Sequence, residues 1–208
     1  MVEQGKYAYQ IRKITQEKIE RLLTETSWSR AMLAKLRRGV GKQPGELPEL
    51  FEVLLGDMPE ELYSKRDEPS YSEWAIYTAL TLFALHQQGK THPMSAGGKT
   101  ENKNSGNSLG AAVGLLVKQD KEREPAIKRR FDAVATANVF TEFAHHARGI
   151  IQLLRAEDIA LDYPRFAEDL FWYQFAEKRN HIRLRWGEDY YYVAQQIAEK
   201  KNGGEHNG

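Results

Sequence analysis

The segment from Phe131 to Arg155 constrains the fold most, because its apolar residues recur at the spacing of an α-helix. Apolar side chains that share one face of this segment are Phe140, Phe143, Ala147, Ile150, Ile151 and Leu154. A second face carries polar residues at offsets of three, four and three positions, namely His145, Arg148, Gln152 and Arg155. Such a helix buries its apolar side and leaves a basic, hydrogen-bonding surface in water. The segment therefore predicts a helical core with a cationic face.

The rest of the chain repeats the helical period, and no convincing strand or internal repeat interrupts it. Ser29, Ser70 and Ser108 stand where N-caps are expected, and Gly39 stands where a helix is expected to end. The predicted helices cover about 7–23, 29–39, 50–55, 71–88, 109–117, 126–138, 139–155, 165–178 and 186–200. The sequence therefore predicts an all-α helical bundle.

One long segment, 90–107, is rich in Gly, Ser and Asn and almost without apolar side chains. It cannot bury enough surface to offset its ordering entropy, so it is predicted to be a mobile cationic loop. The C-terminal residues are predicted to be disordered. The expected organisation is an N-terminal helix at 1–26, an N-terminal lobe at 27–120 with the flexible loop 90–107, a C-terminal lobe at 121–200 and a tail at 201–208.

Composition excludes several classes of protein. The chain has 208 residues and no cysteine, which rules out disulfides, zinc–thiolate sites and thiol catalysis. No apolar run approaches about 20 residues, the length of a membrane span. The N-terminus lacks the apolar core of a signal peptide. A cytoplasmic protein without a membrane partner is expected.

Charge is sorted along the chain although the net charge is only +1. Residues 43–62 hold six acids and no Lys or Arg, whereas residues 118–130 hold six bases against three acids. A further basic cluster at 178–185 contains Lys178, Arg179, Arg183 and Arg185 without an acid. Patches of this kind suit a polyanion on one face and a basic neighbour on another.

Motifs for catalysis are weak. Gly41-Lys42 and Gly98-Lys99-Thr100 resemble phosphate loops, but each lacks the upstream glycine and neither follows a predicted strand. Glu142 and His145 have the spacing of half a di-iron site, and no second such motif occurs. A bundle metalloenzyme that uses these two residues remains an alternative, and a solvated helix face is favoured over it.

Several arginines are candidates for phosphate contact. Four lysines are instead assigned to ordinary solvated helix faces, namely Lys13, Lys18, Lys200 and Lys201. Arg37 and Arg38 end a predicted helix and precede a flexible glycine-containing segment that reaches Lys42. Arg148 has the small neighbours Ala147 and Gly149, which leave its guanidinium accessible. These residues could bind nucleic acid, bind an acidic protein or form salt bridges within the chain, and the sequence leaves all three open. In a competing hypothesis the acidic segment from Glu46 to Glu61 docks a basic partner and the chain is a protein scaffold.

A series of short motifs, in this order, resembles the CasB family, the small subunit of the type I-E CRISPR Cascade surveillance complex. The resemblance covers about 27–193. Its motifs are Ala34-Lys-Leu-Arg-Arg-Gly-Val-Gly-Lys42, the acidic Pro44 to Pro59, the helix Ala75 to Leu85, Ser108-Leu-Gly-Ala, Arg129-Arg130-Phe131, His146-Ala-Arg148 with Leu153-Leu-Arg155, Leu161-Asp-Tyr-Pro-Arg-Phe and Arg183-Leu-Arg-Trp-Gly-Glu-Asp-Tyr190.

The resemblance implies a non-catalytic protein of two small helical lobes that needs no cofactor. It implies as partners the other Cascade subunits, a second copy of the chain, the guide RNA, the target DNA and the displaced single strand. The family's paired basic residues match Arg37-Arg38 and Arg129-Arg130, and its next basic residue matches Arg148. The full set of expected nucleic-acid-binding residues is Arg37, Arg38, Lys42, Arg129, Arg130, Arg148, Arg155, Arg179, Arg183 and Arg185.

Overall fold

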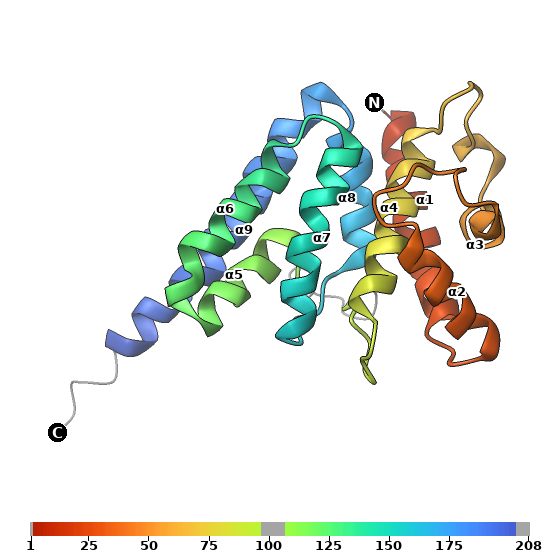
Figure 1. Cartoon of the computed structure of the whole chain (residues 1–208). Coiled ribbons are helices and arrows are strands. Elements are labelled where there is room, and N and C mark those ends of the chain that lie inside the picture. Colours follow the sequence, from red (N-terminus) through yellow and green to blue (C-terminus); the bar gives the residue numbers. More distant parts are fainter. Residues whose placement is uncertain (1, 97–106, 203–208) are drawn as a thin grey trace.

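The computed structural model describes residues 2–96 and 107–202, and these residues form helices joined by short turns (Figure 1). The α-helices are α1 (Val2–Leu22), α2 (Ser27–Arg38), α3 (Phe51–Leu55), α4 (Tyr71–His86), α5 (Leu109–Gln119), α6 (Glu124–Thr136), α7 (Phe140–Ala156), α8 (Tyr163–Tyr173) and α9 (Ala176–Asn202). Short 3-10 turns occur at Pro48–Leu50, Glu60–Leu62 and Lys121–Arg123. Extended pairing in the described part is limited to one isolated bridge between Ser95 and Leu161. The all-α prediction is confirmed.

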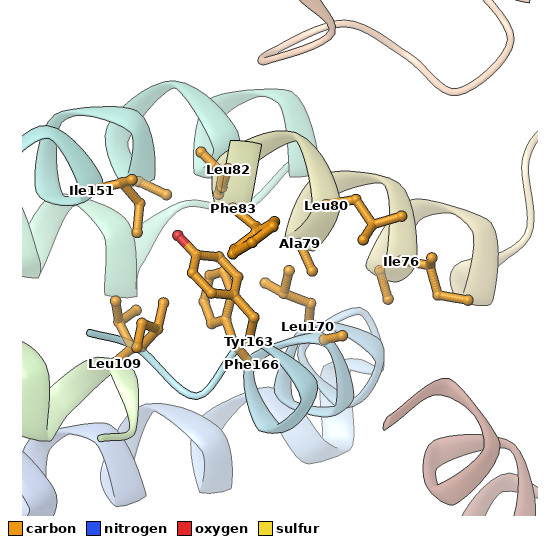
Figure 2. Close-up of a cluster of buried hydrophobic side chains, with 14 of the residues drawn as sticks. Ile76, Ala79, Leu80, Leu82, Phe83, Leu109, Ile151, Tyr163, Phe166 and Leu170 are labelled. Carbon is orange, nitrogen blue, oxygen red and sulfur yellow. The ribbon is translucent and has the colours of Figure 1, made fainter. Parts of the chain in front are cut away.

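Helix α4 forms the centre of the core, because its side chains are buried nearly all round from Ala75 to His86. Helices α1, α2, α7 and α8 pack against it. Figure 2 shows α4 and α8 facing each other, with Leu80 and Phe83 opposite Tyr163 and Leu170. The rings of Phe83 and Tyr163 meet edge to face, with centroids 5.4 Å apart. This arrangement explains why the α4 sequence is apolar on every side.

Helices α5 and α9 run against each other at the far end of the molecule from α1 and α2 (Figure 1). Their backbones approach closely at Gly110, where a β-carbon would lie 1.9 Å from the carbonyl oxygen of Trp186. One cluster of buried side chains extends from Ala8 on α1 to Tyr190 on α9. The expected division into lobes at residues 26 and 120 stays a prediction.

Caps define the helix starts. Ser70 accepts from the Glu73 N–H at 3.0 Å while the Glu73 carboxylate accepts from the Ser70 N–H, so the predicted cap of α4 forms a full capping box. Ser108 caps α5, as predicted. The expected cap at Ser29 is wrong. Thr26 caps α2 instead, because its hydroxyl accepts from the Ser29 N–H at 3.1 Å and this lets the helix start two residues earlier.

The boundary between α8 and α9 also differs from the prediction of helices over 165–178 and 186–200. Helix α8 ends at Tyr173 and α9 begins at Ala176, so the whole basic cluster at 178–185 is helical. Tertiary contacts hold this break. The Gln174 amide donates to the carbonyl oxygen of Tyr71 at 2.9 Å, and the Phe175 ring packs edge-on against the Tyr71 ring at 5.0 Å.

Lys18 departs from its assignment to a solvated face. It is 8 % exposed and donates to the carbonyl oxygen of Gly56, and burial lowers its pKa to about 8. Residues 90–96 of the predicted mobile loop are anchored, with Met94 fully buried and its N–H donating to the Gln87 side chain at 2.9 Å. Residues 97–106 of that loop and 203–208 of the predicted tail lie outside the described residues. No described helix is long and apolar enough to span a membrane.

Candidate nucleic-acid interface

Helices α6 and α7 form an antiparallel hairpin (Figure 1). Three exposed arginines lie on it, namely Arg129, Arg130 and Arg148. Arg129 lies nine residues before Asn138 and Arg148 lies nine residues after Val139, so the two stand at the same level on either side of the turn. Within residues 2–96 and 107–195, no carboxylate lies within 4.0 Å of Arg129, Arg130 or Arg148. Exposed and unneutralised guanidiniums are suited to phosphate oxygens.

The basic corner at the end of α2 consists of Arg37, Arg38 and Lys42. Two of these three residues are paired with carboxylates. The Arg38 guanidinium contacts the Glu49 carboxylate at 2.7 Å, and the Lys42 ammonium lies 3.6 Å from the Glu46 carboxylate. Arg37 differs from these two residues, because it is half-buried and no described carboxylate pairs with it. Burial lowers the pKa of Arg37. The α2 end therefore offers one unneutralised cation and two that would have to exchange partners.

Arg155 joins α7 to the end of α4. Its guanidinium donates to the Gln88 side-chain oxygen at 3.0 Å and to the carbonyl oxygen of Leu85 at 3.5 Å. Leu85 lies in the last turn of α4, and its carbonyl oxygen also accepts from the Gln88 N–H at 3.4 Å. Arg155 thus ties α7 to the end of α4.

Arg179 and Arg183 share the ring of Tyr173, at 5.4 Å and 5.5 Å from its centroid. Arg179 donates to the carbonyl oxygen of Tyr173 at 2.9 Å, which caps the end of α8. Arg183 donates to the carbonyl oxygen of Ala137 at 3.4 Å and so reaches the α6–α7 turn. These contacts tie the start of α9 to its neighbours.

Arg185 pairs with a buried acid. Its guanidinium contacts the carboxylate of Asp169, which is 1 % exposed and also accepts from the indole N–H of Trp186 at 2.7 Å. Burial raises the pKa of Asp169, and the charge of Arg185 opposes that rise. The expected nucleic-acid role of Arg155, Arg179, Arg183 and Arg185 stays a prediction. Their contacts within the fold give all four a structural role.

The acidic segment of the competing scaffold hypothesis is mostly occupied within the chain. In addition to Glu46 and Glu49, Glu52 and Asp57 lie 3.4 Å and 3.8 Å from the guanidinium of Arg21. Glu61 lies 3.7 Å from the ammonium of Lys6. Most of the carboxylates of this segment are therefore already paired with cations of the same chain.

Glu142 serves the backbone at the start of α7. Its carboxylate accepts from the Asn138 N–H at 3.1 Å and lies 3.9 Å from the ring nitrogen of His146. Among the described residues, no three His, Asp or Glu side chains gather closely enough to hold a metal ion. The metalloenzyme alternative with Glu142 and His145 therefore finds no support there.

The sequence did not predict a cationic groove beside α2. Arg30, Leu33 and Arg37 stand at offsets of three and four on α2 and line a groove with Lys90 and His92. The offsets were visible in the sequence. What the sequence could not show is that the turn after α4 folds beside this face.

Comparison with known proteins identifies the family. The family model of the CRISPR-associated protein Cse2 matches residues 32–191, which is more than half of the chain. The crystal structure of CasB from Thermobifida fusca is similar, with 28 % identity, a TM-score of 0.66 and coverage of 88 % of this chain and 97 % of that one.

Two further structures share the fold. M. ruber CasB has 18 % identity, a TM-score of 0.63 and coverage of 92 % and 98 %. A chain of a CRISPR RNA-guided surveillance complex has 17 % identity, a TM-score of 0.68 and coverage of 92 % and 99 %. A search of curated proteins finds no match. The sequence resemblance is confirmed, and the chain belongs to the CRISPR-associated Cse2 family, the family of CasB.

Proposed function

We propose that this protein is the non-catalytic small subunit of the type I-E CRISPR Cascade surveillance complex. In that role it assembles with the other Cascade subunits and a second copy of itself. Its basic face supports the guide RNA, the target DNA and the displaced strand of the R-loop. The observation that carries this proposal is the set of three exposed arginines, Arg129, Arg130 and Arg148, without carboxylate partners in the described structure of a Cse2-family chain.

The energetics suit a small number of contacts. Forming an R-loop is nearly balanced, because the hybrid gained is about as stable as the duplex lost. A few kcal/mol of strand binding can therefore decide whether the R-loop persists. Arg–phosphate contacts supply this energy without reading sequence, and each contact to a single strand contributes a slope of about −0.7 in the logarithmic salt dependence. Three such contacts predict a slope of about −2.

The test is the lifetime of the target R-loop on guide-loaded complex, with this protein present and omitted, at two salt concentrations. We expect a shorter lifetime without it and a smaller difference at high salt. Arg148→Glu should shorten the lifetime while Arg66→Glu should not, because Arg66 is also exposed but lies between α3 and α4, outside the α6–α7 hairpin. Equal lifetimes for the wild-type protein and Arg148→Glu would reject the assigned interface.

A further inference from the structure

A groove of about 460 Å³ lies between α2 and the turn that follows α4. One wall is the face of α2 that carries Arg30, Leu33 and Arg37, and the other wall is formed by Gln88, Lys90 and His92. Figure 1 shows α2 beside α4, with the turn after α4 at the end of that helix. The groove belongs to neither the α6–α7 hairpin nor the paired corner at Arg38.

The groove is cationic. Arg30 and Arg37 are seven residues apart, about two turns or roughly 10 Å along the helix. Neither has a carboxylate within 4.0 Å among the described residues. Lys90 also lines the groove, but its ammonium is paired with the Asp158 carboxylate at 2.5 Å. Glu25 is the acid that lines the groove. Arg37 is half-buried and has no carboxylate partner among the described residues, so its charge is available to an anionic ligand.

Part of the groove lining is apolar, and the turn that forms one wall is held in place. Leu23, Leu33 and Pro93 are apolar lining residues. The Gln87 side chain holds the turn in place by donating to the carbonyl oxygens of Lys90 and His92 at 3.2 Å and 2.9 Å. A site that combines two guanidiniums with a partly apolar lining suits a ligand with both an anionic group and a flat apolar group.

Gln88 links the groove to α7. Gln88, which lines it, accepts the hydrogen bond from Arg155 at 3.0 Å. Arg148 precedes Arg155 by two turns on the same face of α7. Arg155 and Arg148 therefore lie on the side of the groove that Gln88 forms.

We propose that this groove holds one unstacked nucleotide of a single strand, with its phosphate between Arg30 and Arg37 and its base on Leu33 and Pro93. An unpaired nucleotide presents its base face and its phosphate together, whereas a paired base is stacked inside its helix. The strand then continues past Gln88 toward Arg148. This inference rests on the proposed function and names the strand type that the site takes.

The test is a titration of the full chain, followed by two-dimensional ¹H–¹⁵N NMR, with the 5′-phosphorylated thymidine dinucleotide and, separately, with inorganic phosphate at equal ionic strength. We expect saturable shifts of amides in 29–37 and 87–91 with the dinucleotide. The double variant Arg30→Gln/Arg37→Gln should weaken this binding by about tenfold or more. Arg66→Gln should leave it unchanged.

The outcomes separate this inference from the proposed function. The same saturation with phosphate alone at the same concentration would reject the base contact, and no shift in the groove would reject the site altogether. If the groove amides show no chemical-shift changes while Arg148→Glu still shortens the R-loop lifetime, the proposed function stands without the groove. If the groove binds and Arg148→Glu has no effect, the proposed hairpin interface is wrong instead.

Discussion

Gly110 on α5 and Trp186 on α9 stand so close that no β-carbon fits between them. A β-carbon at Gly110 would lie 1.9 Å from the carbonyl oxygen of Trp186 and 2.7 Å from its carbonyl carbon. Both atoms belong to the backbone, so a side-chain rotation cannot relieve the clash. The two helices can meet in this way only because position 110 carries no side chain.

Gly110→Ala should therefore lower the free energy of unfolding by about 3 kcal/mol, since α5 must move away from α9. Gly187→Ala is the matched control, because position 187 lies in α9 and has nothing within 4 Å of its added β-carbon. That change should stabilise by up to about 1 kcal/mol, the difference in helix propensity. Urea denaturation measures both, and similar values for the two variants would contradict the close approach.

Removal of the buried carboxylate of Asp169 should lower the free energy of unfolding strongly. Asp169→Ala leaves the Arg185 guanidinium and the Trp186 indole N–H without their shared acceptor. A loss of about 3–5 kcal/mol is expected, as for other broken buried pairs. Asp132→Ala removes an exposed i,i+4 partner of Lys128 and should cost less than about 1 kcal/mol. Thermal unfolding followed by circular dichroism distinguishes the two, and a small effect at Asp169 would show that water replaces the carboxylate.

Stability should fall in mild acid because of His86. This side chain is fully buried, with one ring nitrogen 3.1 Å from the Tyr163 hydroxyl, and burial lowers its pKa from 6.5 to about 4. Between these two values the unfolded chain binds a proton that the folded protein does not. Folding stability is therefore lost as the pH falls through this window, by roughly 3 kcal/mol in total. Denaturant unfolding from pH 7 to pH 4 should show this loss in the wild type, and His86→Phe should lack it; parallel pH profiles would refute the assignment.

The Glu49 carboxylate should limit phosphate binding by the basic corner of α2. Glu49→Gln removes the carboxylate that contacts Arg38 at 2.7 Å, so the guanidinium becomes available to phosphate. Retention of single-stranded DNA by the guide-loaded complex at low salt should improve by about threefold. Glu60→Gln changes the net charge equally, and no described cation pairs with Glu60. An equal gain from both variants would mean that only the overall charge matters.

The sequence predicted the α7 helix, its apolar face and the accessibility of Arg148, because all three depend on residues within a few turns of each other. It could not predict which basic residues are occupied within the fold. The partner of Arg185 is Asp169, on another helix, and that of Arg38 is Glu49, beyond a loop. These pairings are set by tertiary packing and leave no local pattern.

The helix break at residues 174–175 was hidden for the same reason. Neither glycine nor proline marks it, and the contacts that hold it come from Tyr71, about a hundred positions earlier. By contrast, Ser70 and Ser108 were readable as caps because a cap acts on the next turn of its own chain. Local chemistry was visible in the sequence, whereas long-range contacts required the fold.

The short extended stretch before α8 holds both ends of the segment 97–106. The Ala96 N–H donates to the carbonyl oxygen of Leu161 at 3.1 Å, and the Asp162 N–H donates to the carbonyl oxygen of Asn107 at 2.9 Å. Because both ends are fixed at neighbouring positions, doubling the length between them adds only about 0.6 kcal/mol of closure entropy. We therefore expect a fluorescent label or an inserted domain placed between residues 96 and 107 to leave the helical core undisturbed.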